Sequence, residues 1–235
     1  MSAVILAAGR GARLAPLTDR VPKCLLRVGG RAILDRQLDA LARCGATEVT
    51  IVTGHAADAL DAHVAGRPGI RTVRNPGYSS TDNLASCHAA RSHFGGDATL
   101  LLNGDTLFED AILRDLLAAE AAPVLIAIDR KPHYDADDMK IATTDANRLR
   151  RIGKDLALPD GEATGLTLLR DTGHARFLDE VETRLAAPGG AHALYTEALG
   201  ALAAQDLVGV RAVHGQRWIE IDTAQDLAAA EALWR

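Results

Sequence analysis

A glycine-rich segment follows the first apolar run of the chain and reads, from residue 6 to residue 23, Leu6-Ala-Ala-Gly9-Arg-Gly11-Ala-Arg13-Leu-Ala-Pro16-Leu-Thr-Asp-Arg-Val-Pro22-Lys23. An apolar run that ends in glycine is typical of a buried strand that enters a loop. Because glycine has no Cβ, its backbone N–H group can approach phosphate oxygens closely. Arg13 and Lys23 add positive charge beside these groups. The segment therefore predicts a loop that binds a triphosphate.

Two better-known phosphate-binding motifs do not fit this segment. The dinucleotide fingerprint needs a third glycine, but position 14 is Leu14. Pro16 and Pro22 keep the chain extended or turning, so we expect no helix here. The Gly-Lys-Ser/Thr of a P-loop is absent. A Gly-x-Gly pair alone is equally consistent with a structural turn, but its combination with Arg13 and Pro22-Lys23 is far more specific.

The first half of the chain alternates short apolar runs with amphipathic helical patterns. The expected strands are residues 3–7, 48–53, 70–74, 98–103 and 124–128, and the expected helices are residues 32–44, a segment around Leu60 and Val64, 83–92 and 111–119. This alternation predicts an α/β fold with a mostly parallel central sheet flanked by helices.

The second half has shorter strands and polar turns. Strands are expected at residues 139–144, 148–152, 165–169, 207–213 and 217–221, and helices at residues 173–185, 192–203 and 223–233. The last of these helices begins with a capping-box pattern, Thr223-Ala-Gln-Asp226. No linker separates the halves, so we expect one domain over residues 1–235, with a small β region on the substrate side.

Composition excludes several classes of protein. With 26 Lys+Arg against 31 Asp+Glu, the net charge is −5, and no basic cluster is present to neutralise nucleic-acid phosphates. The 48% hydrophobic content excludes disorder. The three cysteines have no metal-ligand spacing and are interpreted as buried small hydrophobes in a reducing compartment. No apolar run reaches the roughly 20 residues of a membrane span. We expect a soluble, cytoplasmic protein, and a homodimer is left open.

The segment from Leu6 to Lys23 resembles the signature of the nucleotidyltransferases that make NDP-sugars and related CDP compounds. Residues 28–34 are similar to that family's segment before its first helix, and Trp218-Ile-Glu-Ile-Asp222-Thr resembles its second acidic motif. The resemblance implies a Rossmann-like fold and a role for Lys23 in stabilising the phosphates, with Arg13 beside it. The nucleotide-binding residues that it implies in the loop are Leu6, Ala7, Ala8, Gly9 and Gly11.

Two aspartates follow expected strands far apart in the chain. Gly104-Asp105 comes at the carboxyl end of one strand, and Asp222 lies between another strand and the last helix. Two carboxylates over a triphosphate suit Mg²⁺, which takes one or two protein carboxylates together with phosphate oxygens and water. Each aspartate is also consistent with a turn residue or a helix cap. The resemblance places metal-binding aspartates at Asp105 and Asp222, and puts Gly104 beside the nucleotide.

Within the family, one segment distinguishes the branches. Asn75-Pro-Gly-Tyr78-Ser-Ser-Thr-Asp82-Asn83-Leu-Ala-Ser86 resembles the phosphocholine cytidylyltransferase branch and lacks the Gln and Pro-Leu-Gly-Thr segments of sugar nucleotidyltransferases. Asp82 departs from that branch, where an Asn is typical. Asn83 and Ser86 are expected to contact the cytosine, although ordinary capping at the start of a helix explains them as well.

A second branch-level similarity is Tyr134-Asp135-Ala-Asp137-Asp138-Met-Lys140-Ile. It implies that Lys140 aligns the acceptor, although a solvated turn is the simpler interpretation. The remaining residues implied on the acceptor side are Asp138, Lys154, Glu162, Tyr195 and Trp218. A quaternary ammonium acceptor favours aromatic faces, of which Tyr195 and Trp218 are the candidates, and both are also consistent with core residues. A primary amine favours carboxylates, so phosphocholine and an aminoalkylphosphonate both remain open.

The sequence thus predicts a Mg²⁺-dependent cytidylyltransferase that transfers CMP from CTP to a small phosphorylated or phosphonate acceptor. The alternatives are a sugar-1-phosphate uridylyl- or thymidylyltransferase and a non-catalytic nucleotide-sensing subunit. The eight histidines show no zinc pattern, and no Gly-x-Ser-x-Gly elbow supports acyl hydrolysis.

Overall fold

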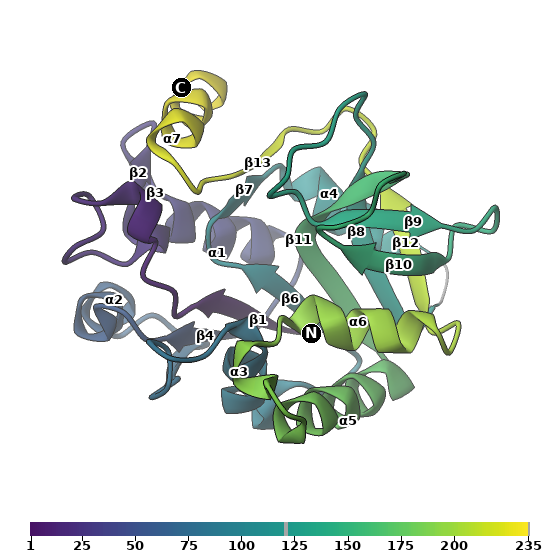
Figure 1. Ribbon diagram of the computed structural model, residues 1–235. Helices are drawn as coiled ribbons and strands as arrows, with labels where there is room; N and C mark the ends of the chain where they lie inside the picture. The colour runs from purple at the N-terminus through teal and green to yellow at the C-terminus, as the bar shows by residue number, and fades with distance from the viewer. Residues whose placement is uncertain (120–121, 235) are drawn as a thin grey trace.

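The computed structural model describes residues 1–119 and 122–234. Within them, a nine-stranded sheet has helices on both faces (Figure 1). The main path of the sheet is β12-β8-β11-β6-β1-β4-β5, and β9 and β10 extend from the start of β11. The strands are β1 (Ser2–Ala7), β4 (Glu48–Thr53), β5 (Ile70–Arg74), β6 (Ala98–Asn103), β8 (Val124–Asp129), β9 (Lys140–Thr143), β10 (Leu149–Gly153), β11 (Gly161–Arg170) and β12 (Val208–Ala212).

The strand directions confirm the expected fold class. β1 is parallel to β4 and β6, β4 is parallel to β5, and β8 is parallel to β12. β11 is antiparallel to both of its main-path neighbours, β6 and β8, and is the one reversed strand of that path in the described residues. The sheet is therefore mostly parallel, and both halves of the chain contribute strands to it. The antiparallel strands β9 and β10 form the small additional β region.

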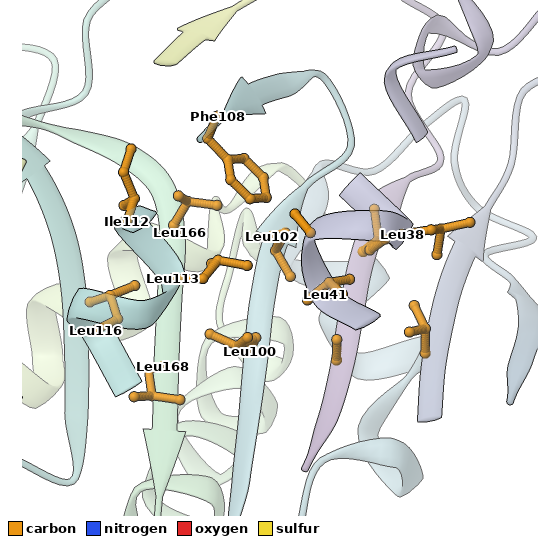
Figure 2. Close-up of a cluster of buried hydrophobic side chains, with 14 of the residues drawn as sticks. Leu38, Leu41, Leu100, Leu102, Phe108, Ile112, Leu113, Leu116, Leu166 and Leu168 are labelled. Carbon is orange, nitrogen blue, oxygen red and sulfur yellow. The ribbon is translucent and has the colours of Figure 1, made fainter. Parts of the chain in front are cut away.

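Alternation along the buried strands divides the core into two layers. Ala3 and Ile5 of β1 and Leu100 and Leu102 of β6 pack on one face, where Figure 2 shows Leu100 and Leu102 close to leucines of the covering helices. Val4 and Leu101 pack on the opposite face. A parallel sheet buried on both faces needs such apolar runs, because helices cover each side.

Seven α-helices are described. They are α1 (Ile33–Arg43), α2 (Ala57–Val64), α3 (Asn83–Ala89), α4 (Asp110–Ala118), α5 (Thr172–Ala186), α6 (Tyr195–Ala203) and α7 (Ala224–Leu233). Helices α1, α2 and α4 cover the first face of the sheet, and α3, α5 and α6 pack together on the second (Figure 1). No helix in the described ranges is long and apolar enough to cross a membrane.

A third, smaller core supports the loop after β1. It joins Leu14 and Leu26 of that loop to Ile221 and Ala230 near the C-terminus. Two short strand pairs frame it, β2 (Arg27–Val28) with β3 (Arg31–Ala32) and β7 (Thr106–Phe108) with β13 (Trp218–Glu220). This packing brings the N-terminal loop, the end of β6 and the end of β13 to one place.

The structure corrects several of the expected elements. Residues 12–14 form one 3₁₀ turn where no helix was expected, because Gly11 adopts a left-handed conformation at φ 63° and starts it. The strand expected at 165–169 begins at Gly161, since its first residues pair with β9 and with the end of β8. The helix expected from residue 192 begins at Tyr195, after a separate 3₁₀ turn. The helix expected over residues 83–92 ends at Ala89, and another 3₁₀ turn follows it.

Candidate active site

The site lies at the point where the order of the parallel strands reverses. Strand β1 pairs with β4 on one side and with β6 on the other, and it is parallel to both. In open α/β sheets, ligands bind outside the carboxyl ends of the strands at such a point. Here the glycine-rich loop follows β1 and Asp105 follows β6. A cavity of about 340 Å³ lies between them, and Leu6, Ala8, Gly9, Asn83, Ser86 and Asp105 are among its lining residues.

Hydrogen bonds hold the glycine-rich loop on one side, and the loop is open at Gly9. The Thr18 hydroxyl donates to the Gly11 carbonyl at 2.8 Å, and a His55 ring nitrogen lies 2.6 Å from the Thr18 carbonyl. A Cβ placed on Gly9 would have no described atom within 4 Å. The loop therefore leaves open space at Gly9, and phosphate binding there stays a prediction.

Lys23 joins the two predicted metal-binding aspartates. Its ammonium lies 2.8 Å from Asp105 Oδ2 and 2.5 Å from Asp222 Oδ1. Arg13 approaches the second oxygen of Asp222 at 2.9 Å. Burial alone would raise the pKa of Asp222, but the charges of Lys23 and Arg13 hold that pKa below its ordinary value. Asp222 is therefore ionised at neutral pH, and two cations and two carboxylates balance within a few ångströms.

Strand pairing explains how residues so distant in sequence meet. β7 and β13 are antiparallel, with Thr106 opposite Glu220. Just beyond that pair, the Ile221 N–H donates to the Asp105 carbonyl at 3.1 Å. The cap of α7 is Thr223, whose hydroxyl accepts from the Asp226 N–H. Asp222 thus does not cap the helix through its side chain, and its carboxylate faces Lys23.

The donor set suits Mg²⁺. Asp105 Oδ1 is buried and has no hydrogen-bond partner within the described part of the chain, so one carboxylate oxygen is left for a cation. No cluster of three or more His, Cys, Asp or Glu side chains with metal-site geometry occurs over residues 1–119 and 122–234. A site with few protein ligands is what Mg²⁺ uses when phosphates and waters complete its octahedron.

Glu220 is a third acidic group at this place, and the sequence did not single it out. It lines the 340 Å³ cavity and two neighbouring ones of about 430 and 150 Å³. Desolvation of the Glu220 carboxyl, together with the negative charges of Asp105 and Asp222, raises its pKa to about 8. Asn103 Nδ2 lies 3.5 Å from Glu220 Oε1. Glu220 therefore lies where the three cavities meet. It belongs to the segment Trp218-Ile-Glu-Ile-Asp222-Thr, which was singled out for Asp222 alone.

The 430 Å³ cavity is lined by an ionic group in which Glu162 is buried. Lys131 Nζ lies 2.8 Å from Asp138 Oδ2 and 2.8 Å from Glu162 Oε2. Burial raises the pKa of Glu162 to about 7, against the opposing charge of Lys131. Trp218 lines the same cavity, and its indole N–H donates to Asp129 Oδ2 at 2.9 Å. Three predicted acceptor residues, Asp138, Glu162 and Trp218, are therefore together. Lys131 was missed, although it lies in the same charged loop as Tyr134.

Other predicted residues occupy different surroundings. Lys140 is buried and donates to the Lys154 carbonyl at 2.9 Å, and it lines none of the three cavities formed by the described residues. Tyr195 is 3% exposed and packs in the second core layer, although it borders the 150 Å³ cavity. Lys154 borders that cavity too, 3.8 Å from Asp137. Roles for all three stay predictions, and the geometry favours Lys154 over Lys140.

The two predicted base-contacting residues lie at the start of α3. Asn83 Oδ1 accepts from the Tyr195 N–H at 2.9 Å, so this side chain fixes the start of α6 rather than capping its own helix. The Ser86 hydroxyl accepts from Asn75 Nδ2 at 3.1 Å. Both residues line the 340 Å³ cavity.

Close packing under the glycine-rich loop supplies a stability prediction. A Cβ on Gly54 would lie 2.5 Å from Tyr78 Cβ and 2.6 Å from the Ala8 carbonyl oxygen. We expect Gly54→Ala to lower the free energy of unfolding by about 1–3 kcal/mol, because the loop must shift. Gly200→Ala in α6, whose new Cβ would have its nearest contact at 3.5 Å, is the matched control and should not destabilise. Chemical denaturation measures both, and equal stability of the two variants would contradict the packing argument.

The raised pKa of Glu162 predicts a pH effect on stability. The pKa lies at about 7 in the folded protein, against 4.5 ordinarily. The uncharged form thus favours folding, and this stabilisation is full below pH 4.5 and lost as pH rises to 7. Relative to Glu162→Gln, the wild type should lose on the order of 3 kcal/mol across that range. Unfolding at pH 4.5, 6 and 8 measures it, with Glu182→Gln on the exposed side of α5 as control. A pH-independent difference would contradict the assignment.

Comparisons with known proteins identify the family of the chain. The family described as MobA-like NTP transferase domain matches residues 3–215. The chain is 35% identical, over 97% of its length, to the CMP-5'-(3-aminopropyl)phosphonate synthase of Streptomyces rubellomurinus, and the match covers 38% of that protein. It is 30% identical, over 46% of its length, to the 2-aminoethylphosphonate cytidylyltransferase of Lancefieldella rimae, of which 44% is covered.

A solved structure shows the same fold. The inositol-1-phosphate CTP transferase from T. maritima superposes with a TM-score of 0.83 at 20% identity, over 98% of this chain and 93% of that one. At this identity the likeness concerns the fold alone, which is Rossmann-like. With nine tenths of its length matched by one family description, the chain belongs to the MobA-like NTP transferase domain family.

Proposed function

We propose that this chain is a Mg²⁺-dependent cytidylyltransferase that transfers CMP from CTP to an aminoalkylphosphonate and releases pyrophosphate. One observation carries the proposal: the Lys23 ammonium lies between Asp105 and Asp222, at the edge where the open glycine-rich loop meets an acidic cavity. The two relatives named for cytidylyl transfer to phosphonates support it.

The chemistry requires positioning more than proton transfer. A phosphonate oxygen of the acceptor attacks the α-phosphorus of CTP and forms a P–O–P bond, while the bond from the α-phosphorus to the bridging oxygen breaks and pyrophosphate leaves. The attacking oxygen is already anionic near neutral pH, so no general base is needed. Lys23 and Arg13 compensate the charge of the phosphates. Mg²⁺ bound at Asp105 and Asp222 would add positive charge where negative charge builds up in this displacement.

The nucleotide is assigned to the 340 Å³ cavity. This cavity joins the glycine-rich loop, suited to the triphosphate, to Asn83 and Ser86, whose amide and hydroxyl groups suit the polar edge of a cytosine. Glu220 lines both this cavity and the 430 Å³ cavity, so the nucleotide compartment and the acceptor compartment are adjacent. An acceptor in the second compartment therefore reaches the nucleotide at the aspartates.

The acceptor compartment favours a primary amine over a quaternary one. Its lining is acidic, with Asp129, Asp135, Asp138 and Glu162, and Trp218 is its one aromatic side chain over the described residues. Tyr195, the second aromatic candidate, is buried elsewhere. Recognition of a trimethylammonium group relies on several aromatic faces, whereas a primary ammonium donates hydrogen bonds to carboxylates.

The test is pyrophosphate release with Mg²⁺ over four nucleoside triphosphates and five acceptors. These are 3-aminopropylphosphonate, 2-aminoethylphosphonate, phosphocholine, phosphoethanolamine and glucose-1-phosphate. The proposal expects release with CTP and one of the two phosphonates above all others. Release with UTP or dTTP and the sugar phosphate would replace it with a sugar nucleotidyltransferase. Silence throughout, with CTP bound, would indicate a nucleotide-sensing protein.

A further inference from the structure

Gln37 is an unusual side chain for its position. It lies on α1 at 1% exposure, between helix residues that pack into the first apolar core layer. Burial of an amide costs free energy unless hydrogen bonds replace those it made with water. Both bonds come from its nitrogen: Gln37 Nε2 donates to the Asn103 carbonyl at 2.8 Å and to the Thr106 carbonyl at 2.8 Å. Its Oε1 has no hydrogen-bond partner among the described residues. The two hydrogen bonds donated by Nε2 are therefore the reason for an amide side chain at this buried position.

The two accepting carbonyls flank Asp105. They stand at the two ends of the turn from Asn103 to Thr106, which connects β6 to β7. The other side of this turn is pressed against β1, because the Gly104 N–H donates to the Leu6 carbonyl at 2.9 Å and a Cβ on Gly104 would meet that oxygen at 2.8 Å. One amide group thus holds both ends of a turn that has no room to shift toward β1.

The same turn sets the distance between the two aspartates. Its Asp105 carbonyl accepts from the Ile221 N–H, one residue before Asp222. A displacement of the turn would therefore move the Asp105 carboxylate relative to both Lys23 and Asp222. We infer that Gln37, which touches neither carboxylate, is a positioning residue that fixes Asp105 for cation and triphosphate binding. This inference rests on the proposed function.

Removal of the donors without loss of volume tests the inference. Gln37→Met keeps an unbranched buried side chain but donates no hydrogen bond. Loss of a group that orients a metal ligand typically weakens metal affinity or activity by about 10- to 100-fold. We expect Gln37→Met to weaken Mn²⁺ binding by about 10- to 100-fold. Electron paramagnetic resonance measures this affinity in the presence of CTP and in the absence of acceptor. The half-saturating Mg²⁺ concentration for turnover should rise by a similar factor, with KM for the acceptor unchanged.

A structural control separates positioning from stability. Leu41→Ala, also fully buried on α1, removes apolar contacts and should cost about 2–5 kcal/mol of stability. The Leu41 side chain donates no hydrogen bond to the turn, so the Mn²⁺ affinity of this variant should match that of the wild type. If Gln37→Met does not fold, Gln37→Asn, whose amide is one methylene too short to reach both carbonyls, takes its place with the same expected loss.

Three results have distinct meanings. Weaker Mn²⁺ binding in the Gln37 variant but not in Leu41→Ala supports the inference. Equal binding in wild type and Gln37 variant overturns it and leaves the proposed function standing. Failure of the wild type itself to bind Mn²⁺ with CTP overturns both.

Discussion

Replacement of Lys23 by methionine should lower kcat/KM for cytidylyl transfer by roughly 30- to 150-fold or more, equivalent to at least about 2–3 kcal/mol of transition-state stabilisation. The reason is electrostatic. The Lys23 ammonium is largely buried and faces the place where the triphosphate would meet the aspartates, with 11% of its side chain exposed. A buried donor acts in a low effective dielectric, where its charge is worth far more than at the surface. Steady-state kinetics with saturating Mg²⁺ measures the effect.

Arg20, in the same loop, offers a matched control for Lys23. Arg20 is exposed, lies three residues before Lys23 and makes no ion pair with any residue that the structure describes. Arg20→Met removes one positive charge from the same loop and should leave turnover within a factor of about two, because exposed charges are screened. Circular dichroism and thermal unfolding with Mg²⁺ and CTP check that both variants are folded. Near-normal turnover of Lys23→Met would remove Lys23 from the mechanism.

Replacement of Asp222 by alanine should abolish the response to Mg²⁺. Asp222 supplies one of the two carboxylates at the predicted metal position, and its low pKa keeps it charged at neutral pH. Without it a single carboxylate remains, and we expect activity to fall by at least about 100-fold at the Mg²⁺ concentration that saturates the wild type. The measurement is turnover against Mg²⁺ concentration over three decades.

The Asp222 experiment also needs a charge control. Asp19, exposed on the N-terminal loop, is suitable because Asp19→Asn removes one negative charge away from the cavities. Its Mg²⁺ curve should overlay that of the wild type. An Asp222→Ala curve that overlays the wild type as well would contradict a metal role for this residue and place the cation elsewhere.

Local sequence patterns predicted the parallel half of the sheet well. The strands expected at 48–53, 70–74 and 98–103 are β4, β5 and β6 without change of bounds, and the expected helix at 32–44 is α1 with one residue fewer at each end. Apolar runs buried on both faces and amphipathic helices carry strong local signals. The predicted placement of Asp105 at the end of β6 followed from the same signals.

Long-range pairing was less accessible. β13 lies within the strand expected at 217–221, whereas β7 was not expected. Both are three residues long and pair across more than 100 residues of chain, so no local pattern indicates that they pair with each other. Without that pairing the meeting of Asp105 and Asp222 rested on resemblance. Lys140 lies in a charge-rich segment typical of a solvated turn, but β9 pairs on both sides and buries it. Gln37 lies among the buried residues of α1. Nothing in the sequence around it indicates that two carbonyls of a distant turn accept hydrogen bonds from its side chain.

The identity of the product tests the proposed cytidylyl transfer most sharply. The purified protein, CTP, Mg²⁺ and 3-aminopropylphosphonate or 2-aminoethylphosphonate are incubated and followed by ³¹P nuclear magnetic resonance. We expect two coupled resonances from a phosphonate joined to a phosphate through one oxygen, with pyrophosphate in equal amount. Unchanged CTP and phosphonate, under conditions in which UTP or dTTP reacts with a sugar phosphate, would contradict the proposed transfer.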